Sequence, residues 1–301
     1  MKFISLFLLF NFNVLSISCS SDSLEFEQKS SNANSAVQTN DLYFDKAVTL
    51  LNEGGIDNVN LAILELKKSA KQGNSEALYN LGTIYHFGKN GEINYKKAID
   101  YYLSASSKNH LIATHNIGIL YQFGLGVEQS YSEAYKWYKR AADQNFPMSI
   151  NAIGALYAKG LGFRENHKQA FQYFEKAAEL GDVAAAYNVS SYYKYGKGIP
   201  QNSQKAFYWS NIAAKKNHPR AQNNLANYYL EGKVVPKDEK KAFYWFKKSA
   251  EQGVAPAQYN LAMLYEEGRG TVKDLEKAKT WYLSAATQGQ TNAWEKAQKL
   301  D

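Results

Sequence analysis

The chain has 301 residues, with 35 basic and 28 acidic side chains that leave a formal net charge of +7, and a single cysteine, Cys19. One cysteine excludes an intrachain disulfide. Because the charges are interleaved without a basic block, they favour a solvated surface and argue against nucleic-acid binding.

Residues 1–18 resemble an export signal. Lys2 supplies a short positive end, and FISLFLLFNFNVLSIS supplies an apolar run that is too short to span a membrane as a permanent helix. Ser16 and Ser18 suit ordinary signal-peptide cleavage. Leu15-Ser-Ile-Ser-Cys19 also resembles a bacterial lipoprotein box, although Ser16 stands where that box normally has a hydrophobic residue.

Lipidation of Cys19 is the favoured outcome, because the cysteine lies at the border between the apolar run and a polar spacer. Residues 20–40 are rich in Ser, Asn and Gln and cannot bury enough apolar surface to fold. We therefore expect residues 19–40 to be a disordered tether. The protein is expected to be exported and then either anchored to a membrane, facing the periplasm or the cell surface, or secreted.

A 36-residue repeat organises the rest of the chain, and such a period indicates a solenoid of stacked units. Residues 41–73 form a degenerate first unit, with helices expected over LYFDKAVTLLNEGG and NLAILELKKSAKQG. Residues 290–301 are expected to form a capping helix, since the last apolar face has no neighbour. The six full units span residues 74–109, 110–145, 146–181, 182–217, 218–253 and 254–289.

Each unit is predicted to be a pair of antiparallel helices with repeated start and stop signals. The first helix ends at a glycine, which adopts a left-handed conformation at low cost. These glycines are Gly88, Gly124, Gly160, Gly196, Gly232 and Gly268. The second helix follows a residue whose side chain can cap its first turn. These caps are Asn94, Ser130, Asn166, Asn202, Asp238 and Asp274. Glu133 and Gln169 stand three residues after their caps and predict a capping box.

The second helix carries an apolar stripe, Ala98, Tyr101, Tyr102 and Ala105 in the first full unit. Small residues on both helices are expected to let the pair approach closely. On the first helix these are Gly82, Gly118 and Gly154, followed by Ser190, Ala226 and Ala262. Each unit closes on Gly or Asn, residue types that suit another helix stop. The closing residues are Asn109, Asn145, Gly181, Asn217, Gly253 and Gly289.

These units resemble Sel1-like repeats, which are related to the tetratricopeptide repeat. The L-G-x-x-Y and A-x-x-x-[FW] elements are shared with the tetratricopeptide pattern, and the G-x-G turn and 36-residue period point to the Sel1 class. The resemblance implies an all-α, right-handed solenoid of about six to seven repeats. Asn90 and Val234 depart from the pattern at the second glycine of the turn, and Ala152 replaces a repeated asparagine.

By resemblance, the first helices line a concave face that binds peptide segments or partner domains. Aromatic and polar residues on these helices suit such recognition, although several tyrosines could instead pack between units. The predicted partner-binding residues are Tyr79, His86, Phe87, His115, Gln122, Phe123, Tyr187, Lys194, Tyr195, Arg220, Asn223, Asn227, Tyr259, Glu266 and Glu267. The two glutamates predict an acidic end, opposite an aromatic and histidine-containing end. The repeated asparagines are expected to hold structural turns.

No catalytic set is found, and no cofactor or metal is expected. His86 and His115 lack a third ligand of suitable spacing. Ser191 and Lys194 have the spacing of a serine–lysine motif, but no companion Lys-Thr-Gly element supports it. The sequence therefore predicts a non-catalytic scaffold that binds a protein partner at the cell envelope. The alternative is a protein that binds or modifies the cell wall, through peptidoglycan or penicillin recognition.

Overall fold

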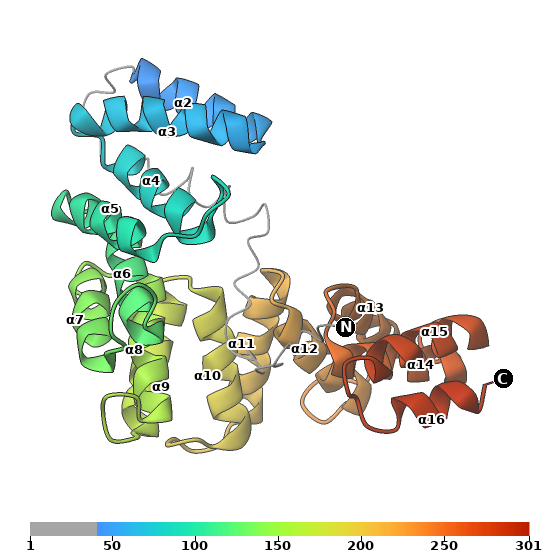
Figure 1. Ribbon diagram of the computed structural model, residues 1–301. Helices are drawn as coiled ribbons and strands as arrows, with labels where there is room; N and C mark the ends of the chain where they lie inside the picture. The colour runs from blue at the N-terminus through green and yellow to red at the C-terminus, as the bar shows by residue number, and fades with distance from the viewer. Residues whose placement is uncertain (1–40, 301) are drawn as a thin grey trace, which may run out of the picture.

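The computed structural model describes residues 41–300, and within this range the chain forms fifteen helices and no strands (Figure 1). The predicted export signal, Cys19 and the tether lie outside the described residues. The helices are α2 (Leu42–Glu53), α3 (Ile56–Lys71), α4 (Ser75–Phe87), α5 (Tyr95–Ser107), α6 (Leu111–Phe123), α7 (Tyr131–Ala142), α8 (Pro147–Lys159), α9 (His167–Glu179), α10 (Val183–Tyr195), α11 (Ser203–Lys215), α12 (Pro219–Glu231), α13 (Glu239–Glu251), α14 (Ala255–Glu267), α15 (Leu275–Ala286) and α16 (Ala293–Gln298).

The helices stack as a curved row of pairs, and each helix packs mainly on the one before it and the one after it (Figure 1). In the first half of the row, α4 and α6 lie toward the inside of the bend, and their partners α5 and α7 lie outside (Figure 1). The predicted all-α solenoid of helix pairs is confirmed.

The degenerate first unit differs from the prediction at its turn. Gly54 and Gly55 have φ values of 71° and 82°, so the chain reverses within two residues. The second helix, α3, consequently begins at Ile56, four residues before the predicted start at Asn60. The connections of the full units are longer and pack against the preceding unit, as Gly126 does against Tyr95 and Gly162 against Tyr131.

The predicted helix stops and starts of the full units are confirmed. The six glycines that end the first helices all have φ between 65° and 71°. Each of the six capping side chains accepts a hydrogen bond from the amide three residues later, as Ser130 Oγ does from Glu133 N at 3.2 Å. The closing Gly and Asn residues also have positive φ. These signals act within a few residues, so the sequence alone identifies them.

The two predicted capping boxes form only in their first half, because the amides of Ser130 and Asn166 donate to tyrosine carbonyls and not to the side chains of Glu133 and Gln169. The Ser130 amide donates to the carbonyl of Tyr121 at 2.9 Å, and the Glu133 carboxylate pairs with Lys136 at 2.7 Å instead of reaching back to it. In each of the six full units the same backbone bond joins the start of the second helix to a tyrosine near the end of the first. These acceptors are Tyr85, Tyr121, Tyr157, Tyr193, Tyr229 and Tyr265.

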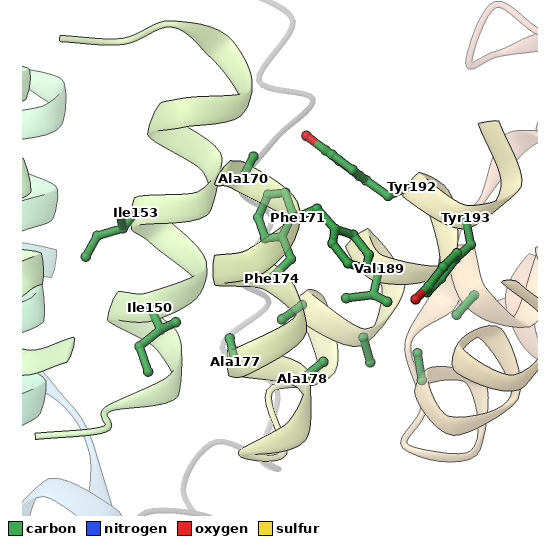
Figure 2. Packing of buried hydrophobic residues seen from close by; sticks show 14 of the residues in the cluster. Ile150, Ile153, Ala170, Phe171, Phe174, Ala177, Ala178, Val189, Tyr192 and Tyr193 are labelled. Atoms are coloured by element: carbon green, nitrogen blue, oxygen red, sulfur yellow. The ribbon is translucent and has the colours of Figure 1, made fainter. Parts of the chain in front are cut away.

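The core is a series of aromatic and aliphatic layers between neighbouring helices. Phe171 and Phe174 of α9 lie between α8 and α10 (Figure 2). The predicted close approach within each pair is confirmed, because a Cβ atom added at Gly118 would lie 2.5 Å from the ring of Tyr138. The small residue on the first helix thus makes room for the aromatic ring of the second.

Candidate functional site

The first helices carry three exposed aromatic side chains at the same position of their repeats. Phe87, Phe123 and Tyr195 end α4, α6 and α10 and are 54%, 37% and 63% exposed. We call these three residues the aromatic row. Single exposed rings are common on protein surfaces, but three rings at one repeat position on the first helices provide a series of apolar contact points along one face of the solenoid.

The residue just before this repeat position forms a hydrogen bond with a buried tyrosine in three of the repeats. Tyr138 donates from its buried hydroxyl to Gln122 Oε1 at 2.8 Å. Tyr282 donates to Glu266 Oε2 at 2.6 Å, and the hydroxyl of Tyr102 lies 3.3 Å from Nδ1 of His86. A buried hydroxyl without a partner is costly, so Gln122 and Glu266 serve the core as polar partners, and His86 shares this role with Thr83, whose hydroxyl lies 3.5 Å from that of Tyr102.

Two of the three repeats that lack this tyrosine also lack the polar partner, whereas the fourth repeat has Ser210 and keeps the polar Lys194. In the third repeat Phe174 faces Ala158, and in the fifth Phe246 faces Leu230 at the equivalent positions. In five of the six full repeats the two positions therefore match, either as a tyrosine with a polar partner or as a phenylalanine with an apolar one. Comparing them between repeats, 16 residues apart, would have revealed this pairing from the sequence.

Cations compensate the two carboxylates of the predicted acidic end. Partial burial alone would raise the pKa of Glu266, but the hydrogen bonds from Tyr282 and Lys296 lower it overall. Lys296 of α16 lies 3.2 Å from Glu266, and Arg269 lies 2.9 Å from Glu267. The C-terminal end of the inner face is therefore a network of paired charges.

Two predicted tyrosines lie at joints between repeats. The ring of Tyr79 stacks on His110, the residue that starts α6, with centroids 4.6 Å apart. Tyr187 stacks on His218 in the same way at 4.5 Å, three repeats later. Tyr259 contacts Tyr282 edge-on at 5.2 Å. The alternative that some tyrosines pack between units therefore holds for Tyr79 and Tyr187, whereas Tyr259 packs within its own unit.

His115 is inside the molecule. Its side chain is 5% exposed, and its Nδ1 lies 2.9 Å from the hydroxyl of Ser149 in the next repeat. The structure thus places His115 within a repeat joint and away from the surface of the inner face. Within residues 41–300, no group of three or more His, Cys, Asp or Glu side chains is arranged to hold a metal ion.

Acid is expected to destabilise the solenoid through two histidines. Burial lowers the pKa of His115 to about 4, and burial together with the nearby Arg220 lowers that of His218 to about 4. Unfolding restores values near 6.5, so between pH 6.5 and 4 the unfolded chain binds protons that the folded chain does not. Stability therefore falls as the pH drops through this window, by about 3 kcal/mol for His115 and by less for the half-buried His218.

Urea unfolding at pH 7.5, 5.5 and 4.5 measures this dependence. Asn151 occupies the position of His115 in the next repeat, so His115→Asn is the matched variant and should lose part of the pH dependence. An equal slope in the parent and the variant would contradict the assignment.

Other predicted residues of the inner face gather on α10 and α12. The ammonium of Lys194 lies 5.4 Å from the ring centroid of Tyr195. Asn227 Nδ2 donates to the carbonyl of Asn223 at 2.9 Å within α12, and Arg220 is exposed. The structure thus brings aromatic and cationic groups together beside the fourth and fifth repeats.

The repeated asparagines for which hydrogen bonds are seen do not hold turns as expected. Asn80 donates to the carbonyl of Glu76 in its own helix at 2.9 Å. Asn188 donates to Asn151 Oδ1 on the first helix of the preceding repeat at 3.0 Å. At these two positions the side chains bond to groups within helices, which corrects the prediction.

Comparisons with known proteins identify the family of the repeats and their bounds. The family model described as "Sel1 repeat" matches residues 75–110, 111–146, 147–182, 183–218, 219–254 and 255–290, each one residue later than the units deduced from the sequence. A Sel1 repeat protein from Oxalobacter formigenes is similar in structure, with a TM-score of 0.74 and 30% identity over 81% of this chain and 99% of that one. No curated protein matches the chain significantly.

A second similar structure is c5321, a protective antigen of uropathogenic Escherichia coli with an SLR fold, which has a TM-score of 0.68 and 29% identity. The match covers 86% of this chain but 56% of the antigen, so this chain spans little more than half of that protein's length. None of the described helices is long and apolar enough to cross a membrane.

Proposed function

Because the chain belongs to the Sel1 repeat family, whose members generally act as scaffolds for protein–protein interaction, we propose that it is an adaptor that binds a partner protein through the inner face of its solenoid. Solenoids of this class are typically non-catalytic. Ser191 and Lys194, the residues of the serine–lysine spacing, lie half-buried on α10, where Lys194 packs over Tyr195.

The aromatic row carries this proposal. Its three side chains repeat at one position of the solenoid and remain exposed, whereas His86 and Gln122, which precede Phe87 and Phe123, contact framework tyrosines. Aromatic side chains often supply most of the binding energy of an interface, because they bury a large area with little loss of entropy. An extended segment crossing several repeats could contact all three.

Alanine substitutions of the aromatic row test the proposal. The triple variant Phe87→Ala, Phe123→Ala and Tyr195→Ala is expected to lose its partner in a crosslinking pull-down from native cells. Removing a central aromatic residue typically costs about 2 kcal/mol or more of binding free energy, so losing three should weaken the complex more than a hundredfold.

The matched control is Tyr208→Ala together with Tyr244→Ala. These tyrosines are 58% and 50% exposed on the second helices α11 and α13, away from the aromatic row. The control variant should retain the partner. Equal capture by the parent and the triple variant, with unchanged circular dichroism, would refute binding through the inner face.

We also propose that the adaptor works at the cell envelope and is held there by a lipid on Cys19. The apolar run of residues 1–18 and the cysteine at its end support this. Cys19→Ser is expected to move the protein from the membrane fraction to the soluble fraction and to change its electrophoretic mobility. Unchanged fractionation and mobility would remove the anchor from the proposal.

A further inference from the structure

The outer face of α3 carries two leucines where the next unit has charged residues. Leu61 and Leu64 are 50% and 55% exposed. The residues 36 positions later, on the outer face of α5, are Lys97 and Asp100. The first unit therefore exposes adjoining apolar side chains at a position that is solvated in the unit stacked on it.

These leucines line a shallow groove of about 380 Å³ between α2 and α3. The groove has an apolar floor and a strongly basic border. It is lined by Lys46, Leu50, Leu61, Leu64, Glu65, Lys67, Lys68 and Lys71.

The single acid of the groove is already neutralised. Glu65 lies 3.0 Å from Lys46 and 3.1 Å from Lys68, and these contacts lower its pKa. Among residues 41–300, no carboxylate lies within ion-pair distance of Lys67 or Lys71. The groove consequently has a surplus of positive charge beside its leucines, which favours an occupant that combines apolar and acidic side chains.

The described chain begins beside this groove. Asp41 caps α2 and accepts hydrogen bonds from Ser69, near the C-terminal end of α3, and from Asn74 at 2.8 Å. The residues that precede Asp41 are therefore attached close to Lys68 and Lys71, at the basic end of α3.

A short segment upstream has the complementary chemistry. Residues 22–27 read Asp-Ser-Leu-Glu-Phe-Glu, so Leu24 and Phe26 alternate with Glu25 and Glu27. In an extended backbone, alternate side chains point to opposite sides, which would present both apolar groups together and both carboxylates together.

We propose that residues 22–27, which lie outside the described residues, bind the α2–α3 groove of the same chain. Leu24 and Phe26 then cover Leu61 and Leu64, and the long side chains of Lys67 and Lys71 at the border of the groove reach around the segment to the carboxylates on its other side. Thirteen residues lie between Glu27 and Asp41, and this stretch reaches up to roughly 45 Å when extended, about twice the length of α3. Because the segment is tethered, its effective concentration at the groove is on the order of millimolar.

This binding would hold the segment after the predicted anchor against the first unit. It involves the outer face of α3, whereas the proposed partner site lies on the inner face of α4 to α12. A failure of either proposal therefore leaves the other unaffected.

Lysine reactivity tests the contact. The purified protein and its Leu24→Ser/Phe26→Ser variant are briefly acylated, and the modification of Lys67 and Lys71 is followed by mass spectrometry. The expected result is a several-fold faster reaction of both lysines in the variant, with no change at Lys247 on α13. Leu61→Ser/Leu64→Ser should produce the same increase.

Leu103→Ser is the matched control, because Leu103 is an exposed leucine (39%) on the outer face of α5, and it should leave both lysines as in the parent. A synthetic peptide of residues 20–30, added at millimolar concentration, should restore protection in the Leu24→Ser/Phe26→Ser variant. Equal reactivity of parent and variant would overturn the proposal. Protection that depends on protein concentration would also overturn it, since a second copy would then be the occupant.

Discussion

Tyr138→Ala is expected to destabilise the solenoid by about 3–5 kcal/mol, the range for deleting a fully buried aromatic ring. The ring is 1% exposed and packs over Gly118 in the second full repeat. Its removal leaves a cavity between α6 and α7 and an unpaired Oε1 on Gln122. Urea unfolding followed by circular dichroism measures the loss.

Tyr138→Phe separates the hydroxyl from the ring. It keeps the packing but leaves the side chain of Gln122 without its donor, which costs about 1–2 kcal/mol. Adding Gln122→Leu reproduces the natural pair of the fifth repeat, Phe246 and Leu230, and should restore most of the stability. If the double variant is no more stable than Tyr138→Phe alone, the hydroxyl and Gln122 are not coupled.

Gly270→Val is expected to destabilise the last full repeat by about 2–6 kcal/mol, because backbone strain and steric overlap each cost about 1–3 kcal/mol. Gly270 has a φ of 69°, and a Cβ atom there would collide with the carbonyl of Glu239 at the start of α13. Thermal unfolding and amide hydrogen exchange in α14 and α15 should both show the loss.

Val234→Gly is the matched control, since Val234 occupies the equivalent position in the fifth repeat and its φ is not positive. The exchange should change stability by no more than about 1 kcal/mol, the cost of added backbone freedom. Equal effects of the two substitutions would mean that the turn conformation does not distinguish the two loops. In the first full repeat, where Asn90 replaces this glycine, the positive φ lies instead at Gly91.

The framework could be predicted because its signals are local and occur many times. A cap such as Ser130 and a stop such as Gly124 act on amides and carbonyls a few residues away. Where the sequence departs from the shared pattern, the bounds of the helices are predicted less well. The two-residue turn at Gly54 made α3 longer than expected.

The predicted hydrogen bond between the side chain of Glu133 and the amide of its cap is also wrong, because the capping-box pattern takes account of hydrogen bonds within one helix only. The Ser130 amide has a better acceptor in the Tyr121 carbonyl of the neighbouring helix. A nine-residue separation across a helix–helix connection is not visible in a pattern that spans four residues.

The predicted partner-binding residues differ in whether a neighbouring repeat covers them. Phe87, Phe123 and Tyr195 project into solvent, whereas His115 is enclosed at a repeat joint. The first-helix periodicity places all four on one side of their helices but does not say what packs against that side. His115 is buried because Phe146 and Ser149 of the following repeat cover it.

By itself, the sequence determined the helix pairs, their starts and stops and the 36-residue period, because caps, glycines and apolar stripes act over one or two turns of helix. Only the tertiary structure decided which side chains of the inner face are free. Gln122 depends on Tyr138, 16 residues away, and Glu266 depends on Lys296, 30 residues away. Burial and pairing of this kind arise when helices stack, so the exposed aromatic row becomes visible only once the repeats are assembled.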